Sequence, residues 1–103
     1  MNVHCDTRRM LIDWGEGKAW KTCKTVHVYE RMSIGDHYHK EKDERFMLVY
    51  GSGMKTINGK TSLFNLNDIV DIEAGTKHEF LLEPGSILIC LCTKVFTETD
   101  DYK

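Results

Sequence analysis

The chain has 103 residues with 14 basic and 16 acidic side chains, and its formal net charge of −2 offers no electrostatic footprint for nucleic acid or an anionic membrane. A hydrophobic content of 41% is enough for one modest core, so we expect a single domain over residues 1–103. No apolar stretch approaches the ~20 residues that span a bilayer, and the N-terminus lacks a hydrophobic signal core, so a cytoplasmic location is expected.

Turn-forming residues divide the chain into short extended segments. Residues 1–25 predict an N-terminal strand or short helix that covers the core, and residues 26–96 predict the core of a barrel. β-branched and aromatic residues predict a strand over 26–32, after which Ile34-Gly35-Asp36 predicts a bend. Further strands are expected over 45–50, 54–57, 60–64, 69–72, 77–82 and 87–96.

Asn58-Gly59 gives the clearest turn signal, because both residues tolerate the positive φ of a type I′ hairpin turn. Short strands at this spacing are typical of an antiparallel sandwich or barrel. The charged run over residues 40–45 is interpreted as a solvated loop around one buried side chain, Glu44. The fold class is therefore predicted to be all-β.

Side chains of the types that bind transition metals recur along the chain, at His37, His39, Glu44 and His78. Two imidazoles two residues apart lie on one side of an extended strand, whereas a helix would turn them about 200° apart. Three imidazoles and one carboxylate suit one divalent ion of Fe, Mn, Ni, Co or Zn, and the affinity order alone does not choose among these metals. We therefore predict that these four residues bind a single metal ion.

The spacing of these residues resembles a known family motif. The pattern H-x-H-x4-E-x6-G, filled here by His37, His39, Glu44 and Gly51, is similar to the first conserved motif of the cupin superfamily of small β-barrels. The glycine that usually stands ahead of the first histidine is replaced by Arg31. The first motif is thus kept in all of its ligands and altered at its start.

The second cupin motif, G-x5-P-x-G-x2-H-x3-N, is partly kept. Gly75 and His78 match it, whereas Asn67, Glu73 and Leu82 stand in place of its first glycine, its proline and its asparagine. Asparagine tolerates positive φ better than other non-glycine residues, so the first turn can still form. The resemblance covers about residues 26–92 and implies a cupin-type double-stranded β-helix, a jelly-roll barrel with the metal inside.

The resemblance also implies a function. Residues 37–44 and 99–103 look like those of carbohydrate- and polysaccharide-pathway cupins, which implies a metal-dependent isomerase or epimerase acting on a sugar or sugar-phosphate-like metabolite. Two alternatives remain open. One is an iron-dependent dioxygenase, similar to the acireductone or thiol dioxygenases, and the other is a non-catalytic cupin that binds a metabolite or its metal.

Strand parity predicts which side chains share the metal cavity. Counting by twos from Glu44 and from His78 gives an apolar and aromatic set: Phe46, Leu48, Tyr50, Phe80 and Leu82. A sugar isomerase needs an acid–base group besides the metal ligands, and the candidates are Tyr29, Tyr50, His27 and Lys77. Tyr50 is predicted to be catalytic because it shares the parity of Glu44, although a core tyrosine would show the same parity.

The cysteines fit a reducing compartment. Cys90 and Cys92 share one face of a strand and are interpreted as small core or interface residues. A zinc site built from Cys5, Cys23, Cys90 and Cys92 would lack any C-x2-C pair. A disulfide between Cys5 and Cys23 would be disfavoured in such a compartment.

A second apolar surface predicts self-association. Residues 87–92 are apolar on both faces of their strand, and Met47 and Val49 lie opposite to the cavity face of theirs. A strand that is apolar on both faces must be buried on both faces, and a second subunit can bury the outer one, so we predict a homodimer. The alternative is that the N-terminal segment, with Trp14 and Trp20, folds back over this surface.

Overall fold

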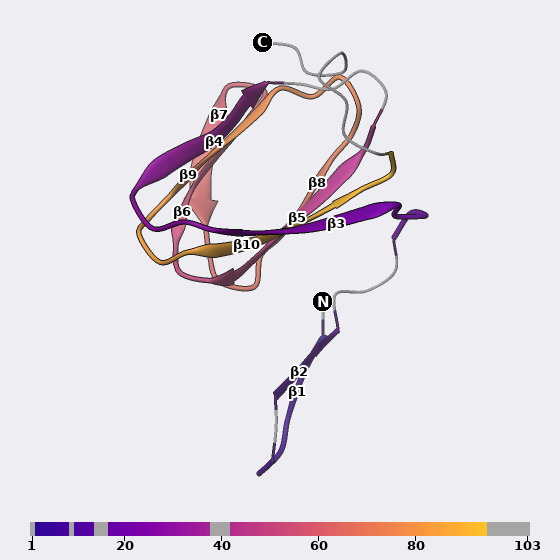
Figure 1. Cartoon of the computed structure of the whole chain (residues 1–103), viewed down its shortest axis with the longest axis vertical. Coiled ribbons are helices and arrows are strands. Elements are labelled where there is room, and N and C mark those ends of the chain that lie inside the picture. The colour runs from indigo at the N-terminus through magenta and orange to yellow at the C-terminus, as the bar shows by residue number, and fades with distance from the viewer. Residues whose placement is uncertain (1, 9, 14–16, 38–41, 95–103) are drawn as a thin grey trace.

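In the computed structural model, residues 2–8, 10–13, 17–37 and 42–94 are described, and their regular elements are all strands (Figure 1). No helix capable of crossing a membrane occurs in these ranges. The strands are β1 (Asn2–Cys5), β2 (Met10–Asp13), β3 (Thr22–His27), β4 (Met32–His37), β5 (Glu44–Tyr50), β6 (Gly53–Ile57), β7 (Lys60–Phe64), β8 (Ile69–Ile72), β9 (His78–Leu82) and β10 (Ile87–Cys92).

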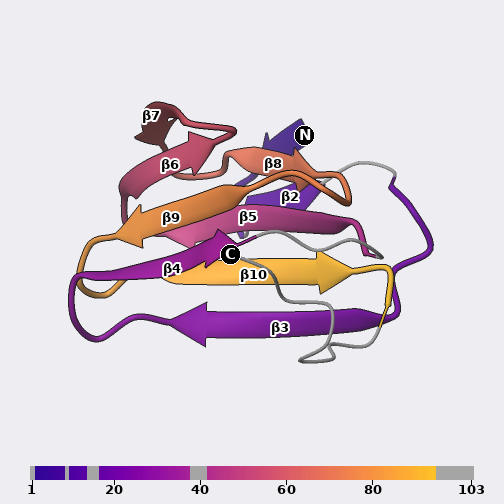
Figure 2. The same cartoon turned by 90° about the horizontal axis from the view of Figure 1, so that it is seen from above.

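The barrel consists of two four-stranded antiparallel sheets that face each other, as Figures 1 and 2 show. The strand order is β3-β10-β5-β8 in one sheet and β4-β9-β6-β7 in the other. Most neighbours are distant in sequence, so the chain crosses repeatedly between the sheets, as in a jelly roll. The predicted all-β jelly-roll barrel is confirmed.

The core lies between the two sheets and follows strand parity. β9 alternates strictly, burying His78, Phe80 and Leu82, and β10 buries every second residue from Leu88 onward. The predicted inner residues Phe46 and Leu48 are 5% and 0% exposed. Counting by twos therefore identified the inner face of β9, of β10 and of β5 as far as Leu48 correctly, because successive side chains of a strand point to opposite faces of the sheet.

Two turns confirm the predictions based on positive φ. Asn58 has φ 50° and Gly59 has φ 79° between β6 and β7, as the type I′ prediction requires. Asn67, which replaces the first glycine of the second motif, has φ 69° and donates its backbone N–H to the Leu48 carbonyl at 2.7 Å. The asparagine thus preserves the backbone conformation that the glycine would supply.

The predicted strand over 26–32 is wrong, because the chain changes sheets inside it. β3 ends at His27, and the crossover is fixed at Val28, which is 1% exposed and bonds through its backbone to Ser86 and Gly85. β3 also starts at Thr22, ahead of the predicted start of the barrel at residue 26. Strand propensity indicates that the backbone is extended, but it does not indicate which sheet a segment pairs with.

The N-terminal segment forms a hairpin rather than a helix. β1 and β2 pair with each other in a two-stranded sheet of their own, which lies apart from the barrel at the bottom of Figure 1. Trp20 returns to the barrel, where the Arg45 guanidinium lies 5.4 Å from its ring centroid. Trp14 lies outside the described residues.

Candidate functional site

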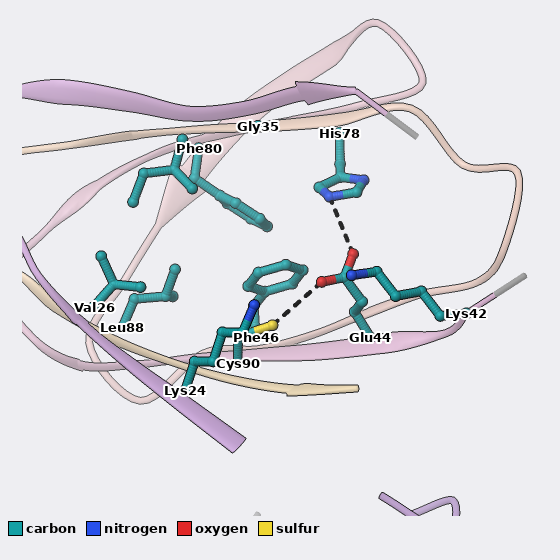
Figure 3. A pocket seen from close by; sticks show the side chains of 11 residues that line it. Lys24, Val26, Gly35, Lys42, Glu44, Phe46, His78, Phe80, Leu88 and Cys90 are labelled. Atoms are coloured by element: carbon teal, nitrogen blue, oxygen red, sulfur yellow. Dashed lines mark hydrogen bonds and ion pairs between the residues drawn. The ribbon is translucent and has the colours of Figure 1, made fainter. Parts of the chain in front are cut away.

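Glu44 and His78 face each other across the barrel, one at the start of each inner strand. Glu44 begins β5 in one sheet and His78 begins β9 in the other, and the distance from His78 Nε2 to Glu44 Oε1 is 3.5 Å (Figure 3). Their side chains are 6% and 1% exposed, respectively. The pair borders a cavity of about 150 Å³, lined by Lys24, Val26, Ile34, Gly35, Lys42, Glu44, Phe46, His78, Phe80, Leu88 and Cys90.

The imidazole of His78 is oriented by its other nitrogen. Its Nδ1 lies 3.0 Å from the Thr76 carbonyl oxygen, and a carbonyl can only accept, so Nδ1 carries the donated proton. In neutral His78 the lone pair of Nε2 then points at the carboxylate of Glu44. Two acceptors at this separation repel unless a proton or a metal cation lies between them, so the geometry favours a site that holds one or the other.

His37 approaches the same place through its backbone. It is the ladder partner of His78 in the β4–β9 pairing, after a register shift between Gly35 and His37. Gly35 makes this irregularity possible, since it has φ 100° and a Cβ there would lie 2.8 Å from the His78 carbonyl oxygen. The predicted bend at residues 34–36 is therefore a bulge within β4. The side chain of His37 and the whole of His39 lie outside the described residues.

Sequence reasoning missed two thiols at this site. Cys92 is the ladder partner of Glu44, so both side chains point inward, and the Cys90 and Cys92 sulfurs lie 3.3 Å and 3.5 Å from Glu44 Oε2. The two sulfurs are 3.6 Å apart. The sequence could predict that Cys90 and Cys92 share one face of their strand. It could not predict their contact with Glu44, because that contact depends on the register between β10 and β5.

The pKa values of the two thiols shift in opposite directions. A hydrogen bond from Cys90 lowers the pKa of Cys92 to about 7, because the donated proton stabilises the Cys92 thiolate. The same bond, together with burial and the charge of Glu44, raises the pKa of Cys90. Cys5 and Cys23 are exposed and all four thiols are free, so no Cys5–Cys23 disulfide is present. Among the described residues, only Cys90 and Cys92 of the four cysteines belong to a group with the spacing of metal ligands, so the four sulfurs are not brought together.

Two lysines give the cavity a positive side. Lys24 lies on β3 as the ladder partner of Cys90, and Lys42 precedes β5 with only 4% of its surface exposed (Figure 3). The interpretation of residues 40–45 as a solvated loop around Glu44 is therefore wrong for Lys42. The sequence did contain a signal for its burial. Lys42 stands two residues before Glu44, and an extended chain places residues two apart on the same side.

Tyr50 is not brought to this cavity. Its side chain is 62% exposed, and it stands six residues from Glu44, or about 20 Å along a strand. The β10–β5 ladder pairs Leu88 with Leu48 and Ile87 with Tyr50, so a bulge at Val49 breaks the parity on which the catalytic prediction depended.

The remaining acid–base candidates also lie elsewhere. Tyr29 is 83% exposed, and its ring contacts that of His27 with centroids 5.2 Å apart. Lys77 does not line the cavity beside Glu44 but lines a second one, together with Thr56, Gly59, His78 and Glu79. Among the described residues, the ionisable groups that line the cavity beside Glu44 and His78 are thus those two residues, Cys90 and the two lysines, and Cys92 contacts Glu44 behind them.

The protein is similar to known proteins in its structure but not detectably in its sequence. No model of a known protein family matches the sequence, and no curated protein matches it. The structure is similar to ChmJ, a 3'-monoepimerase from Streptomyces bikiniensis solved in complex with dTDP-quinovose, with a TM-score of 0.85 and 17% identity over 97% of this chain and 64% of that one. It is also similar to the rmlC epimerase of Mycobacterium tuberculosis, with a TM-score of 0.82 and 15% identity over 97% and 64% of the two chains.

A third similar structure is QdtA, a sugar 3,4-ketoisomerase from Thermoanaerobacterium thermosaccharolyticum in complex with TDP. Its TM-score is 0.80 and its identity 21%, over 97% of this chain and 81% of that one. The chain thus spans 64% of the length of the two epimerases above and more of the ketoisomerase. At such identities the likeness establishes architecture, and on that ground the chain has the cupin fold.

Proposed function

We propose that this chain is a sugar-modifying cupin that isomerises or epimerises a sugar or sugar-phosphate-like metabolite in the cavity beside Glu44 and His78. The observation that carries the proposal is the buried pair itself, with His78 Nε2 and Glu44 Oε1 3.5 Å apart at the wall of a cavity. Similar structures named as an epimerase and a ketoisomerase support the same class of chemistry.

The size and charge of the cavity suit such a ligand. Its volume of about 150 Å³ lies below the range of about 300 to 1,000 Å³ typical of sites for drug-sized molecules, so it suits one sugar-sized group. Lys24 and Lys42 place cationic groups beside it, which favours a ligand with a phosphate or other anionic substituent. The remainder of a larger ligand, such as a nucleotide, would lie outside.

Isomerisation and epimerisation both move a proton at a carbon next to a carbonyl group. In the chain without an ion, His78 Nε2 and Glu44 Oε1 lie close enough to relay such a proton between them, and the Thr76 carbonyl keeps the imidazole ring from turning. Phe46 and Phe80 pack their rings beside His78, with centroids 5.6 Å and 6.0 Å from its own. These walls are 5% and 0% exposed, so they exclude water and strengthen electrostatic interactions within the cavity.

We further propose that His37, His39, Glu44 and His78 hold one divalent transition ion, of Fe, Mn, Ni, Co or Zn. The donor types fit, and a separation of 3.5 Å between Nε2 and Oε1 is close to the roughly 3.0 to 3.4 Å between two ligands of one ion. Such an ion would take the place of the relayed proton between His78 Nε2 and Glu44 Oε1, and it would polarise a carbonyl oxygen of the substrate as a Lewis acid. The catalytic role predicted for Tyr50 does not form part of this proposal.

The reaction is tested by proton exchange. The protein is incubated in D₂O with a panel of keto-sugars, sugar phosphates and dTDP-linked 4-keto sugars, and NMR follows deuterium uptake next to the carbonyl. We expect catalysed uptake with one class, and a loss of at least about 100-fold in Glu44→Gln and in His78→Gln, since general acid–base groups contribute about 10²- to 10⁴-fold.

Glu79→Gln is the matched control, because Glu79 follows His78 on the other face of β9 and accepts a hydrogen bond from Ser33 at 2.6 Å. It should retain the wild-type rate. Equal exchange by wild type and Glu44→Gln would refute the proposal. Saturable binding of a sugar without exchange would instead indicate a non-catalytic binding protein, and oxygen uptake with bound iron would indicate a dioxygenase.

We also propose a homodimer. On the outer face of β10, Ile87, Ile89 and Leu91 remain half-buried within one chain. The β1–β2 hairpin pairs only with itself among the described strands, and a lone two-stranded sheet is marginally stable in water. A second copy would supply cover for both features.

A further inference from the structure

Glu44, Cys90 and Cys92 bring three metal-binding atoms together inside the barrel. Within the described part of the chain, this is the group whose carboxylate and sulfur atoms all lie within 4.8 Å of one another. All three side chains are buried, and they come from two neighbouring strands, β5 and β10. The proposed function uses Glu44 and assigns no role to the thiols.

The distances within this group match those around a tetrahedral ion. A Zn²⁺ with Zn–S of about 2.3 Å and Zn–O of about 2.0 to 2.2 Å spaces two sulfurs about 3.8 Å apart, and a sulfur and an oxygen about 3.5 Å apart. The observed separations are 3.6 Å between the sulfurs, and 3.3 Å and 3.5 Å from the sulfurs to Glu44 Oε2. Small rotations about side-chain bonds are enough to convert this arrangement into a ligand set.

The backbone holds the three ligands in place without an ion. Glu44 pairs with Cys92 and Phe46 pairs with Cys90 in the β5–β10 ladder, so regular hydrogen bonding fixes the spacing of the ligands. Sites built on strands are positioned more precisely than sites on loops. Little reorganisation is therefore needed when an ion binds.

We propose that Cys90, Cys92 and Glu44 form a thiolate-containing site for one thiophilic divalent cation, Zn²⁺ or its substitute Co²⁺. Two sulfurs and one oxygen leave the fourth tetrahedral position for a water or ligand atom, the arrangement of a catalytic rather than a structural zinc site. Glu44 and Cys90 both line the cavity, so that position opens toward the proposed sugar site. The site shares Glu44 with the proposed function but needs neither its reaction nor His37 and His39.

The donor chemistry decides which metal binds. Soft thiolate ligands select zinc over magnesium, calcium or manganese, whereas an imidazole and carboxylate set accepts several first-row ions. A thiolate site therefore predicts zinc in the purified protein. It also predicts that the His/Glu set and the thiolate site compete for Glu44, so that one ion is bound per chain.

X-ray absorption at the zinc edge gives the most direct test, on the full untagged chain with one equivalent of Zn²⁺. We expect a shell of two sulfur atoms at about 2.3 Å. A shell of nitrogen and oxygen alone would overturn the inference, because no thiolate would then contact the ion. This measurement uses the wild-type protein, so it does not depend on whether a variant folds.

Cobalt titration tests the same ligands individually. Thiolate-bound Co²⁺ shows charge-transfer absorption in the near ultraviolet, which we expect for the wild type and for Cys23→Ser, where an exposed thiol on the adjacent strand β3 is removed. Cys90→Ser and Cys92→Ser should each weaken binding by more than about 100-fold, because changes outside the ligand set alone cost about 10- to 100-fold. Unchanged affinity in both variants would exclude the site.

The His37→Ala/His39→Ala double variant separates this inference from the proposed function. Tight binding in the double variant, with sulfur in the wild-type shell, supports the thiolate site and removes the four-ligand site. Loss of the ion in the double variant, with a shell free of sulfur, supports the four-ligand site and removes the thiolate site. Deuterium exchange into sugars reports on the proposed reaction under either outcome.

Discussion

Cys92 on β10 is the direct ladder partner of Glu44 on β5, and its sulfur lies 3.5 Å from Glu44 Oε2. A cross-strand pair of this kind shares one face of the sheet, so the carboxylate that faces His78 is also fixed from its own side by a thiol. Substitution of Cys92 should therefore displace Glu44 even where no metal binds. Glu44 thus contacts Cys92 in its own sheet and His78 in the opposite sheet.

Lys42 should bind the anionic part of the ligand. Lys42→Met keeps the buried aliphatic stem and removes the charge, so affinity for a sugar phosphate should fall about tenfold or more while that for the unphosphorylated sugar stays the same. Isothermal titration with the matched pair of ligands measures this difference. Lys60→Met, at the exposed β6–β7 turn, is the control. Equal losses for both ligands would argue that Lys42 stabilises the fold instead.

Gly35→Ala should be more destabilising than an alanine at another glycine of positive φ. Gly35 has φ 100°, and an alanine Cβ there would lie 2.8 Å from the His78 carbonyl oxygen, whereas Gly85 has φ 84° with open space around it. Both variants carry backbone strain of about 1 to 2 kcal/mol, and only Gly35→Ala adds a clash with backbone. We expect its loss of unfolding free energy to exceed that of Gly85→Ala by about 1 kcal/mol or more in urea denaturation. Equal losses would show that β4 adjusts freely beside His78.

Arg45→Lys should destabilise the protein by about 1 kcal/mol. Arg45 binds Asp71 through Nε at 2.6 Å and through a second guanidinium nitrogen at 2.9 Å, and it also covers the Trp20 ring. Lysine cannot reproduce either the paired contact or the stacking. Arg31→Lys is the matched control, because its ion pair with Glu83 is exposed on both sides and should contribute less than about 0.5 kcal/mol. Thermal unfolding of the two variants provides the comparison, and equal shifts would contradict the role given to Arg45.

The chain should have twice its monomer mass of 11.9 kDa in solution. Met47 is 3% exposed within one chain, so the contact is expected on the outer face of β10 and at the β1–β2 hairpin rather than at Met47. Deletion of residues 1–13 should weaken the dimer by at least about tenfold without unfolding the barrel. Analytical ultracentrifugation measures both forms. A monomer mass at micromolar concentration for the intact chain would rule out this assembly.

Local sequence determined much of this architecture. The Asn58-Gly59 turn, the inward residues of β9 and β10, and the positive φ of Asn67 follow from backbone sterics and from the period of a strand. The cupin fold was predicted from the resemblance of the H-x-H-x4-E-x6-G spacing to a known family motif. Each of these features depends on residues that are close together in the chain.

Tertiary structure decided what surrounds Glu44. The thiols of Cys90 and Cys92 reach its carboxylate only because β10 pairs with β5 in one particular register, and a shift of one residue would turn both sulfurs outward. The bulge at Val49 breaks strand parity and leaves Tyr50 exposed, and the sheet change at Val28 ends a segment of uniform strand propensity. Pairing between segments that are distant in the sequence sets these features, and no local preference encodes it.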